Sequence, residues 1–261
     1  MYPILFSTPW FNVYSYGLLI ALGYTLGTIL ILREARRQGL NTDAIFDMLL
    51  LQLIVGICGS RLLFVVEYAP DKLNFSDFFA FDQGGLTFYG AVISSIIFDL
   101  LYLKYRKLPF WQVIDCVGYG LPAGIALARV GCLLNGCCYG TSSNLPWAMH
   151  FAAAGSGTCH PTQLYESLGA LLIWYLLYRL SAWRRNYGEM FLACMGAYGL
   201  LRFIIEFFRA ENPVFVLGLT MAQVIGLLMI AVAFFTWKKI AASRSQRIIP
   251  DQKPLALVAH S

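Results

Sequence analysis

The chain has 261 residues, of which 59% are hydrophobic and 13% are charged. A soluble globular protein carries roughly 25% charged residues, which cover a surface that faces water. The composition therefore excludes an ordinary soluble domain and indicates that most of the surface faces lipid. The formal net charge of +5 does not predict nucleic-acid binding, because the basic residues follow a pattern that membrane topology explains.

Seven segments are long and apolar enough to be helical membrane spans, each of which needs about 20 apolar residues. They are Val13–Leu32, Ala44–Tyr68, Gly85–Leu103, Trp111–Leu134, Gln163–Ala182, Glu189–Phe208 and Phe215–Trp237. We therefore expect an all-α integral membrane protein with seven transmembrane helices and short extracytoplasmic loop segments. Residues 1–261 are expected to form a single transmembrane domain, in which residues 237–261 are a basic cytoplasmic tail.

The basic residues alternate between the two sides of this arrangement. If all seven segments cross, fourteen of the nineteen Lys and Arg residues fall on one side. These are Arg33, Arg36, Arg37, Lys104, Arg106, Lys107, Arg179, Arg184, Arg185, Lys238, Lys239, Arg244, Arg247 and Lys253. The opposite side has only Lys72 and Arg209. Because basic residues favour the cytoplasmic side, the N-terminus is expected outside and the C-terminus in the cytoplasm.

Six of the expected spans carry polar residues near their outer ends. They are Tyr16, Arg61, Tyr89, Arg129, then His160, Gln163 and Glu166, then Arg202, Glu206 and Arg209. An ionisable group at membrane depth is costly unless it is paired or hydrated, so such groups mark functional sites. Their convergence at one depth predicts a ligand site near the outer leaflet. Alternatively, the arginines only hold helices together; for Glu166 alone, helix pairing is the favoured interpretation. Asp99 and Asp115 are expected to be hydrated at the cytoplasmic ends of their spans.

The sixth span has a polar stripe. Tyr198, Arg202 and Glu206 are four residues apart and Arg209 follows three residues later, a spacing that places side chains on one helix face. With Arg61 and Arg129 the cluster keeps a positive charge. Because arginine binds phosphate through a fixed two-pronged geometry, this stripe favours an anionic headgroup as the ligand.

Glycines stand beside two of these positions. Gly84 and Gly85 precede the third span, and Gly131 and Gly136 lie near the end of the fourth. Glycine lets the backbone turn sharply or lets a ligand approach the main chain. We expect both segments to border the site.

The seven cysteines divide into two sets. Cys58, Cys116 and Cys194 lie within apolar runs and are expected to be small buried residues. Cys132, Cys137, Cys138 and Cys159, with His160, form a set whose spacing does not match the usual zinc pairs. A disulfide from Cys159 to Cys137 or Cys138, or free thiols, is favoured for an extracytoplasmic location, and no metal site is expected.

Five segments resemble one known family. They are Tyr16-Gly17, Gly84 to Gly90, Arg129 to Gly136, His160 to Glu166, and Tyr198 to Arg209. Their order and spacing agree across nearly the whole chain with the bacterial prolipoprotein diacylglyceryl transferases. That family's seven-span topology, with the N-terminus outside, is similar to the one that the charges predict.

The resemblance implies a reaction in the bacterial cytoplasmic (inner) membrane. The diacylglyceryl group of phosphatidylglycerol is joined to the lipobox cysteine thiol of a preprolipoprotein, and glycerol phosphate leaves. Phosphatidylglycerol and preprolipoprotein signal peptides are therefore the expected partners, with no nucleic acid and no cofactor. Arg129 and Arg202 match the family's functional arginines and would hold the phosphate. Tyr16, Asn135, Gly136 and Glu206 match positions associated with lipid binding or site architecture. The remaining candidates for substrate binding are Arg61, Gly84, Gly85, His160, Gln163, Glu166 and Arg209.

The chain departs from the family pattern at two positions. Tyr89 stands where many members have a histidine that is a candidate base for the thiol, and Cys132 stands where some have asparagine. A tyrosine hydroxyl is a poor base at neutral pH unless its surroundings perturb it. Three alternatives remain for removing the thiol proton. Tyr89 takes it, Tyr198 takes it, or the thiol ionises beside the arginines without a base. The departure also allows a catalytically altered or inactive paralogue that binds anionic phospholipid, whereas a transporter is disfavoured because no internal repeat is evident.

Overall fold

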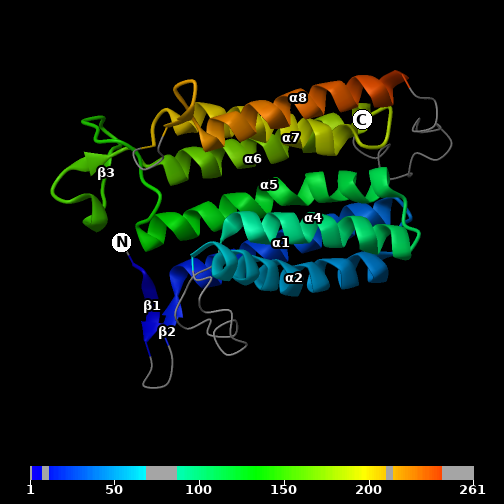
Figure 1. The fold of residues 1–261 in the computed structure, drawn as a ribbon, viewed down its shortest axis with the longest axis horizontal. Coiled ribbons are helices and arrows are strands. Elements are labelled where there is room, and N and C mark those ends of the chain that lie inside the picture. Colours follow the sequence, from blue (N-terminus) through cyan, green and yellow to red (C-terminus); the bar gives the residue numbers. More distant parts are fainter. Residues whose placement is uncertain (1, 8–11, 69–86, 210–213, 243–261) are drawn as a thin grey trace. The chain divides into compact units, whose positions relative to one another are not determined.

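The computed structural model describes residues 2–7, 12–68, 87–209 and 214–242. They form two compact units, which are Met1–Gln38 with Ile114–Ser261, and Gly39–Val113. Gly84, Gly85 and the predicted tail beyond Ala242 lie outside the described residues. The described residues contain seven long helices and three two-stranded antiparallel sheets (Figure 1).

One long helix corresponds to each of the seven predicted spans. These helices are α1 (Ser15–Arg37), α2 (Thr42–Tyr68), α4 (Phe88–Tyr105), α5 (Phe110–Asn135), α6 (Thr162–Leu180), α7 (Glu189–Glu206) and α8 (Met221–Ala242). Four of them, α1, α2, α5 and α8, are long and apolar enough to cross a membrane by length and composition. The short elements are the 3₁₀ helices η3 (Ala152–Ala154) and η4 (Ser181–Trp183) and six strands. The strands pair as β1 (Ile4–Ser7) with β2 (Asn12–Tyr14), β3 (Met149–His150) with β4 (Thr158–Cys159), and β5 (Val214–Val216) with β6 (Leu219–Thr220).

Two predicted helix starts are wrong because apolar strands precede the helices. The first span was predicted from Val13, but β2 occupies that residue and α1 begins at Ser15. The last was predicted from Phe215, which lies in β5. Leu217 and Gly218 then turn the chain with φ of 51° and 79°, the positive values that a two-residue hairpin loop needs. Short apolar strands cannot be told from helix ends by hydropathy.

Helices α1 and α5 approach closely through glycines. Gly23 and Gly27 on α1 face Gly120 and Gly124 on α5. A Cβ atom on Gly23 would lie 2.6 Å from the Gly124 carbonyl oxygen, and one on Gly120 would lie 2.6 Å from the Gly27 carbonyl oxygen. Small residues at four-residue spacing bring helix backbones together, as in membrane helix pairs. This packing fixes the end of α1 that carries Tyr16 against the end of α5.

Helix α7 is anchored at its start by a buried carboxylate. Asp115 of α5 is buried and accepts hydrogen bonds from the backbone N–H groups of Gly188 at 2.7 Å and Phe191 at 3.0 Å. The prediction that Asp115 is hydrated is therefore wrong, because the unpaired N–H groups of a helix start replace water. Ser167 of α6 donates to the Ala126 carbonyl of α5 at 2.9 Å. Figure 1 shows α6, α7 and α8 side by side.

The unit Gly39–Val113 is built on α2 and α4. Ser94 donates to the Val55 carbonyl at 3.2 Å, and Gln52 donates to Asp99 at 2.8 Å. Asp99 thus has a protein partner instead of the predicted hydration alone. Cys58 is exposed on α2, which contradicts its predicted burial, whereas Cys116 and Cys194 are buried as predicted. Helix α2 is apolar all round, so its sequence does not reveal which face points inward.

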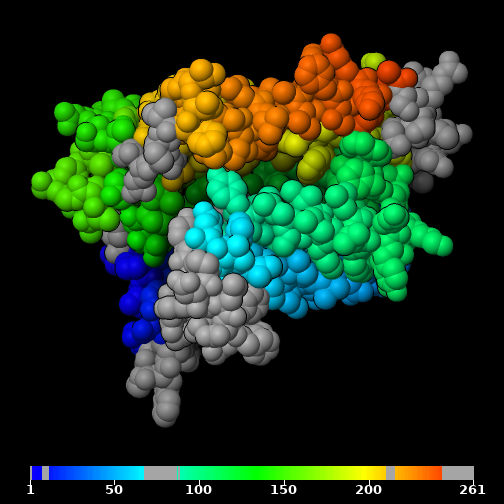
Figure 2. All heavy atoms as spheres, viewed as in Figure 1, coloured from blue at the N-terminus to red at the C-terminus, as the bar shows by residue number. Residues whose placement is uncertain are grey.

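The outward faces of the helices are apolar. On α8, exposed side chains include Leu227, Leu228, Phe234 and Phe235, and Figure 2 shows this helix, in orange, forming an outer surface of its unit. Contiguous exposed apolar surface of this kind marks an interaction site, and on long apolar helices it marks contact with lipid.

Candidate functional site

A buried carboxylate joins three helices at the centre of the predicted site. Glu166 lies in the second turn of α6, and its side chain is 2% exposed. Arg129 Nη2 of α5 lies 2.9 Å from Glu166 Oε1, and Arg202 Nη1 of α7 lies 3.1 Å from Oε2. Tyr198 Oη donates to Oε1 at 2.7 Å. The helix-pairing interpretation of Glu166 is confirmed, and the same contacts bring the two predicted phosphate-binding arginines together.

A second carboxylate holds Arg202 from the other side. Arg202 Nη2 lies 3.4 Å from Glu206 Oε2, and Thr220 Oγ1 donates to Glu206 Oε1 at 2.9 Å. Thr220 is in turn held by Gln223, whose Oε1 accepts its backbone N–H at 3.0 Å. Sequence reasoning missed Thr220 and Gln223, since nothing in the local pattern distinguishes a threonine before an apolar helix.

The stripe predicted on the sixth span is correct for three of its four members. Tyr198, Arg202 and Glu206 lie on α7 and share contacts through Glu166 and Arg202. Arg209 lies beyond the end of α7, where its backbone forms an isolated bridge with Gly140. Its predicted place on the helical stripe is therefore wrong, because the helix ends at Glu206.

The carboxylates of this cluster are buried more deeply than its arginines. The two carboxylates are 2% and 0% exposed, whereas the side chains of Arg129 and Arg202 are 23% and 17% exposed. The formal charges of Arg129, Arg202, Glu166 and Glu206 cancel, so the predicted positive surplus depends on Arg61 and Arg209.

Tyr16 lies at the same end of the unit as Arg129. Beneath them α1 passes close to Gly131 of α5, where an added Cβ would lie 3.1 Å from the Leu19 Cβ and 3.4 Å from the Tyr16 carbonyl oxygen. The predicted close approach at Gly131 is therefore a helix–helix contact that sets the position of Tyr16.

Gly136 ends α5 with a sharp turn. Its φ is 77°, its N–H bonds to the Leu133 carbonyl at 3.1 Å, and the Cys137 N–H bonds to the Cys132 carbonyl at 3.2 Å. This pair of bonds defines the glycine-capped turn that closes many helices. Asn135, the last residue of the helix, is exposed. The turn predicted at Gly136 is confirmed, and it folds the following cysteines back toward Cys132.

Residues at the start of α6 hold this returning loop. Thr162 Oγ1 donates to the Cys138 carbonyl at 2.7 Å, and Gln163 Nε2 donates to the Cys137 carbonyl at 2.6 Å. Both side chains are buried. In this structure Gln163, a predicted substrate-binding residue, therefore positions the loop beside Arg129.

The cysteines in this region are free thiols. All seven cysteines are unpaired, so of the two favoured alternatives the structure has free thiols and lacks the disulfide from Cys159. Hydrogen bonds from Cys132 and Cys137, followed by the charges of Arg209 and Arg129, hold the pKa of the Cys138 thiol well below its usual range. Cys159 is buried in β4.

An aromatic group covers the start of α6. His160 Nδ1 lies 3.2 Å from Tyr165 Oη, which accepts a hydrogen bond from Trp147 Nε1 at 2.8 Å. The rings of His160 and Phe208 have centroids 5.2 Å apart. Figure 1 shows β3, which follows Trp147, at this same end of the bundle. His160 is thus placed by a network that includes Trp147 and Tyr165, whose part in it sequence reasoning did not identify.

Two predicted residues lie in the unit Gly39–Val113. Arg61 is buried on α2 with its guanidinium 5.4 Å from the centroid of the Phe64 ring. Tyr89 is 50% exposed in the first turn of α4. Their place beside Arg129 stays a prediction, as does that of Gly84 and Gly85.

The chain is similar to known proteins over almost its whole length. Residues 3–238 match the model of the family described as "Prolipoprotein diacylglyceryl transferase". The phosphatidylglycerol--prolipoprotein diacylglyceryl transferase of Clostridium tetani is 31% identical over 91% of this chain and 97% of its own. The transferase of the same name from Azoarcus sp. is 33% identical over 88% of this chain and 92% of its own. The one from Verminephrobacter eiseniae is 36% identical over 76% of this chain and 75% of its own. The chain therefore belongs to the prolipoprotein diacylglyceryl transferase family.

Proposed function

We propose that this chain transfers the diacylglyceryl group of phosphatidylglycerol to the lipobox cysteine thiol of preprolipoproteins, the first step of lipoprotein maturation. The relatives' names contain both substrates. Within this chain, one observation carries the proposal: a single buried carboxylate, Glu166, holds the guanidinium groups of Arg129 and Arg202. A neutral ligand would not need two cations, whose burial beside a carboxylate costs desolvation free energy.

Arg129 and Arg202 bind the phosphodiester of the lipid. Each guanidinium carries five N–H donors, and Glu166 and Glu206 occupy only some of those directions. Because both carboxylates are buried and contact these arginines, they fix the guanidinium planes before the lipid arrives. Donors that are preorganised in this way stabilise charge that develops in a transition state without reorganising during the reaction.

The reaction breaks a carbon–oxygen bond and forms a carbon–sulfur bond. The cysteine sulfur attacks the glyceryl carbon of the diacylglyceryl group, and the electron pair of the carbon–oxygen bond leaves with the phosphate. The products are a thioether and glycerol phosphate. The leaving phosphate gains negative charge during this step, and Arg129 and Arg202 stabilise that gain. The thiol proton leaves before or during the attack.

Tyr89 and Tyr198 are the two sequence candidates for removing that proton. Tyr198 donates its own hydrogen bond to Glu166, which favours a positioning role for its hydroxyl. Tyr89 is half exposed and stands where many family members have a histidine, so we assign it the contact with the incoming thiol.

The other predicted residues complete the lipid site. The residues that line or shape it, together with Glu166 and Glu206, are Tyr16, Asn135, Gly136, His160, Gln163 and Arg209. Arg61, Gly84 and Gly85 stay predicted members of the site. Arg209 supplies positive charge beyond the neutral Arg129–Glu166–Arg202–Glu206 cluster. An anionic headgroup is thereby preferred over a zwitterionic one.

The chain acts as a single domain in the bacterial inner membrane. All seven helices cross it with the N-terminus outside and the basic tail in the cytoplasm, and the site opens near the outer leaflet. The charge asymmetry of the loops supports this orientation. It also supports the site's depth, since Tyr16, Arg129, Glu166 and Arg202 then lie in the outer halves of their spans.

The test uses purified protein in phosphatidylglycerol micelles with a lipobox peptide. Transfer of the diacylglyceryl group is measured as the increase in the mass of the peptide. The expected product has one added diacylglyceryl group on its cysteine, and phosphatidylcholine micelles are expected to yield none. Arg129→Lys and Arg202→Lys keep the charge but lose the two-pronged geometry, so each is expected to reduce the rate at least about tenfold. Arg179→Lys, on an exposed part of α6, is the matched control.

The proposal fails if folded protein adds no mass to the peptide. If transfer occurs but both lysine variants match the Arg179→Lys control, the transferase stands and the role of the arginines does not.

A further inference from the structure

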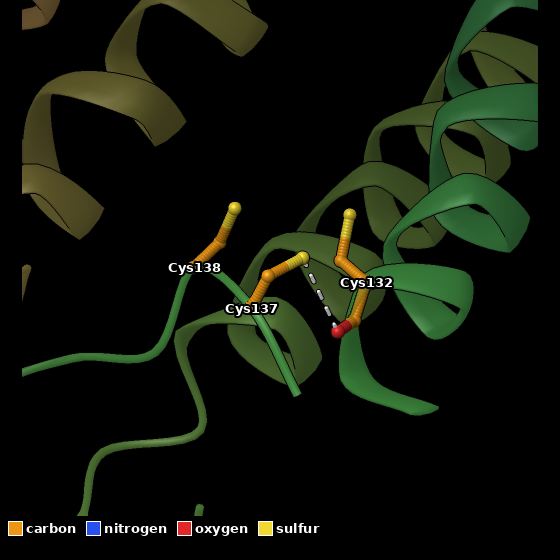
Figure 3. Close-up of side chains that lie close together, drawn as sticks. All are labelled: Cys132, Cys137 and Cys138. Atoms are coloured by element: carbon orange, nitrogen blue, oxygen red, sulfur yellow. Dashed lines mark hydrogen bonds between the residues drawn. The ribbon is translucent and has the colours of Figure 1, made fainter. Parts of the chain in front are cut away.

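Three thiols meet beside the candidate site without a part in the proposed reaction. The sulfur atoms of Cys132, Cys137 and Cys138 all lie within 4.8 Å of one another. Figure 3 shows the three side chains together where α5 ends, with Cys137 donating a hydrogen bond to the Cys132 carbonyl at 3.6 Å. The turn at Gly136 creates this arrangement, because it brings two consecutive loop residues back to the last turn of the helix.

The loop that carries two of these thiols is fixed. The carbonyl groups of Cys137 and Cys138 accept hydrogen bonds from the buried Gln163 and Thr162 at 2.6 and 2.7 Å. Cys138 also has a φ of 64°, which is uncommon for a residue other than glycine. Anchored carbonyls and a constrained backbone hold the three sulfur atoms together before any ligand arrives, so little ordering is needed for a ligand to bind them.

A guanidinium group lies beside these sulfur atoms. Arg129 Nη1 lies 3.9 Å from Cys132 Sγ. The Nε atom of Arg209 is buried and has no hydrogen-bond partner among the described residues. Three thiolates gathered around one divalent ion carry one excess negative charge. Glu166 already pairs with Arg129, so the positive charge that is left to offset it is that of Arg209.

We propose that Cys132, Cys137 and Cys138 form a binding site for a thiophilic d¹⁰ cation such as Zn²⁺ or Cd²⁺. Metal–sulfur bonds of about 2.3 Å place the sulfur atoms about 3.8–4.0 Å apart. The sulfur atoms therefore need to approach by less than about 1 Å, which side-chain rotation supplies. Thiolates select such soft cations. Each thiol that binds releases its proton to solvent, and no electron is transferred.

The spacing explains why the sequence did not predict this site. Cys132 and Cys137 have four residues between them, the upper end of the spacing of a zinc pair, but Cys132 lies in a helix, and only the turn at Gly136 brings it together with two adjacent loop residues. Cys159 and His160, which are close in sequence to the set, lie outside the group of three that the described residues form. With three protein ligands, the ion keeps a coordination position for water.

The site is tested by titrating the full-length protein, reduced and then freed of reductant, with Cd²⁺ in detergent. Thiolate–Cd²⁺ bonds absorb in the ultraviolet, so the expected result is one ion per chain and competition by Zn²⁺. Cys132→Ser and Cys138→Ser are each expected to weaken binding at least about tenfold. Cys159→Ser, which changes a buried cysteine of the neighbouring strand, is the matched control and is expected to bind normally.

A second measurement does not depend on absorbance. Because an ion that binds the folded state stabilises it, Cd²⁺ is expected to raise the melting temperature of the parent protein and of Cys159→Ser, but not of Cys132→Ser. Normal binding by Cys132→Ser and Cys138→Ser overturns the proposal. The proposal is also overturned if the parent protein binds no Cd²⁺ although all seven thiols react with a thiol reagent. A third contrary result is a disulfide between two of the three cysteines that persists in excess reductant. None of these results depends on transferase activity.

Discussion

Glu166 lies 2.9 Å from Arg129 and is almost fully buried, although 37 positions separate the two residues in the chain. The same carboxylate binds Arg202 and Tyr198. A buried ion pair is a weak source of stability by itself, because desolvation costs about as much as the attraction gains. Its value here is geometric, since one carboxylate fixes two cations from different helices.

Replacing this carboxylate tests that geometry. Glu166→Gln leaves Arg129 without its carboxylate partner and Arg202 with only Glu206. The cluster gains one positive charge, and the guanidinium groups lose their common support. Breaking such a buried pair costs about 3–5 kcal/mol. We expect the maximal transfer rate to fall at least about a hundredfold, without an increase in the mole fraction of phosphatidylglycerol that gives half the maximal rate.

The control for this change is Glu189→Gln. Glu189 stands at the opposite end of α7 and accepts local hydrogen bonds from Arg185 and Asn186. The variant is expected to keep the parent rate. An unchanged maximal rate in Glu166→Gln would show that Glu166 does not position the arginines.

Tyr198→Phe removes one hydroxyl from the cluster. The lost hydrogen bond to Glu166 is 2.7 Å long, and hydrogen bonds to charged groups contribute about 1.5–3 kcal/mol. We expect the rate to fall roughly tenfold to a hundredfold if the whole of that energy positions Glu166 in the transition state. The measurement is the pH dependence of transfer, which is expected to keep its shape because Tyr198 positions Glu166 and does not accept the thiol proton. Tyr178→Phe, at an exposed tyrosine of α6, is the control; a changed pH profile in Tyr198→Phe alone would instead make Tyr198 the base.

Tyr89 is tested by two substitutions with opposite expectations. Tyr89→Phe removes the hydroxyl and is expected to reduce turnover, whereas Tyr89→His restores the residue type of many family members and is expected to retain it. Because Tyr89 is half exposed, neither change should lower the melting temperature. Turnover is measured with a lipobox peptide at several pH values. If Tyr89→Phe equals the parent at every pH, the phenol has no catalytic part.

Periodicity and charge predicted much of the fold, and they did so for physical reasons. A helix in lipid must bury its backbone hydrogen bonds over a fixed length, so apolar runs give the seven helices directly. Their ends were harder. At Val13 and Phe215 the chain is apolar but extended, and at Arg209 it is polar but no longer helical. Hydropathy reports the environment of a residue and not its backbone conformation.

The sequence predicted which residues belong to the site better than it predicted which of them contact one another. The four-residue spacing on α7 placed Tyr198, Arg202 and Glu206 together. Which carboxylate binds which arginine depends on helix packing, so Glu166 was not identifiable as the residue shared by both arginines. Thr220 reaches Glu206 from a hairpin 14 positions away, and no local pattern marks such a contact.

Gly23→Ala tests the close packing of α1 on α5. The added methyl group would lie 2.6 Å from the Gly124 carbonyl oxygen, which is backbone and cannot move aside. Overpacking of this kind costs about 1–3 kcal/mol, so the melting temperature in detergent is expected to fall. Gly17→Ala is the matched control on the same helix, since an added Cβ there meets nothing within 4 Å. Equal melting temperatures for the two variants would contradict the helix contact.

Gly136→Ala tests whether the turn at the end of α5 shapes the site. The residue has a φ of 77°, which alanine adopts only at a cost of about 1 kcal/mol. The strain falls on the turn that holds Cys137 and Cys138 beside Arg129, so we expect reduced transfer with a small loss of stability. Gly157→Ala is the control in the neighbouring loop, because an added Cβ there also meets nothing within 4 Å. Transfer and melting temperature are measured for both variants at equal lipid content. If Gly136→Ala transfers as fast as Gly157→Ala, the turn serves only to end the helix, and the position of the loop does not affect Arg129.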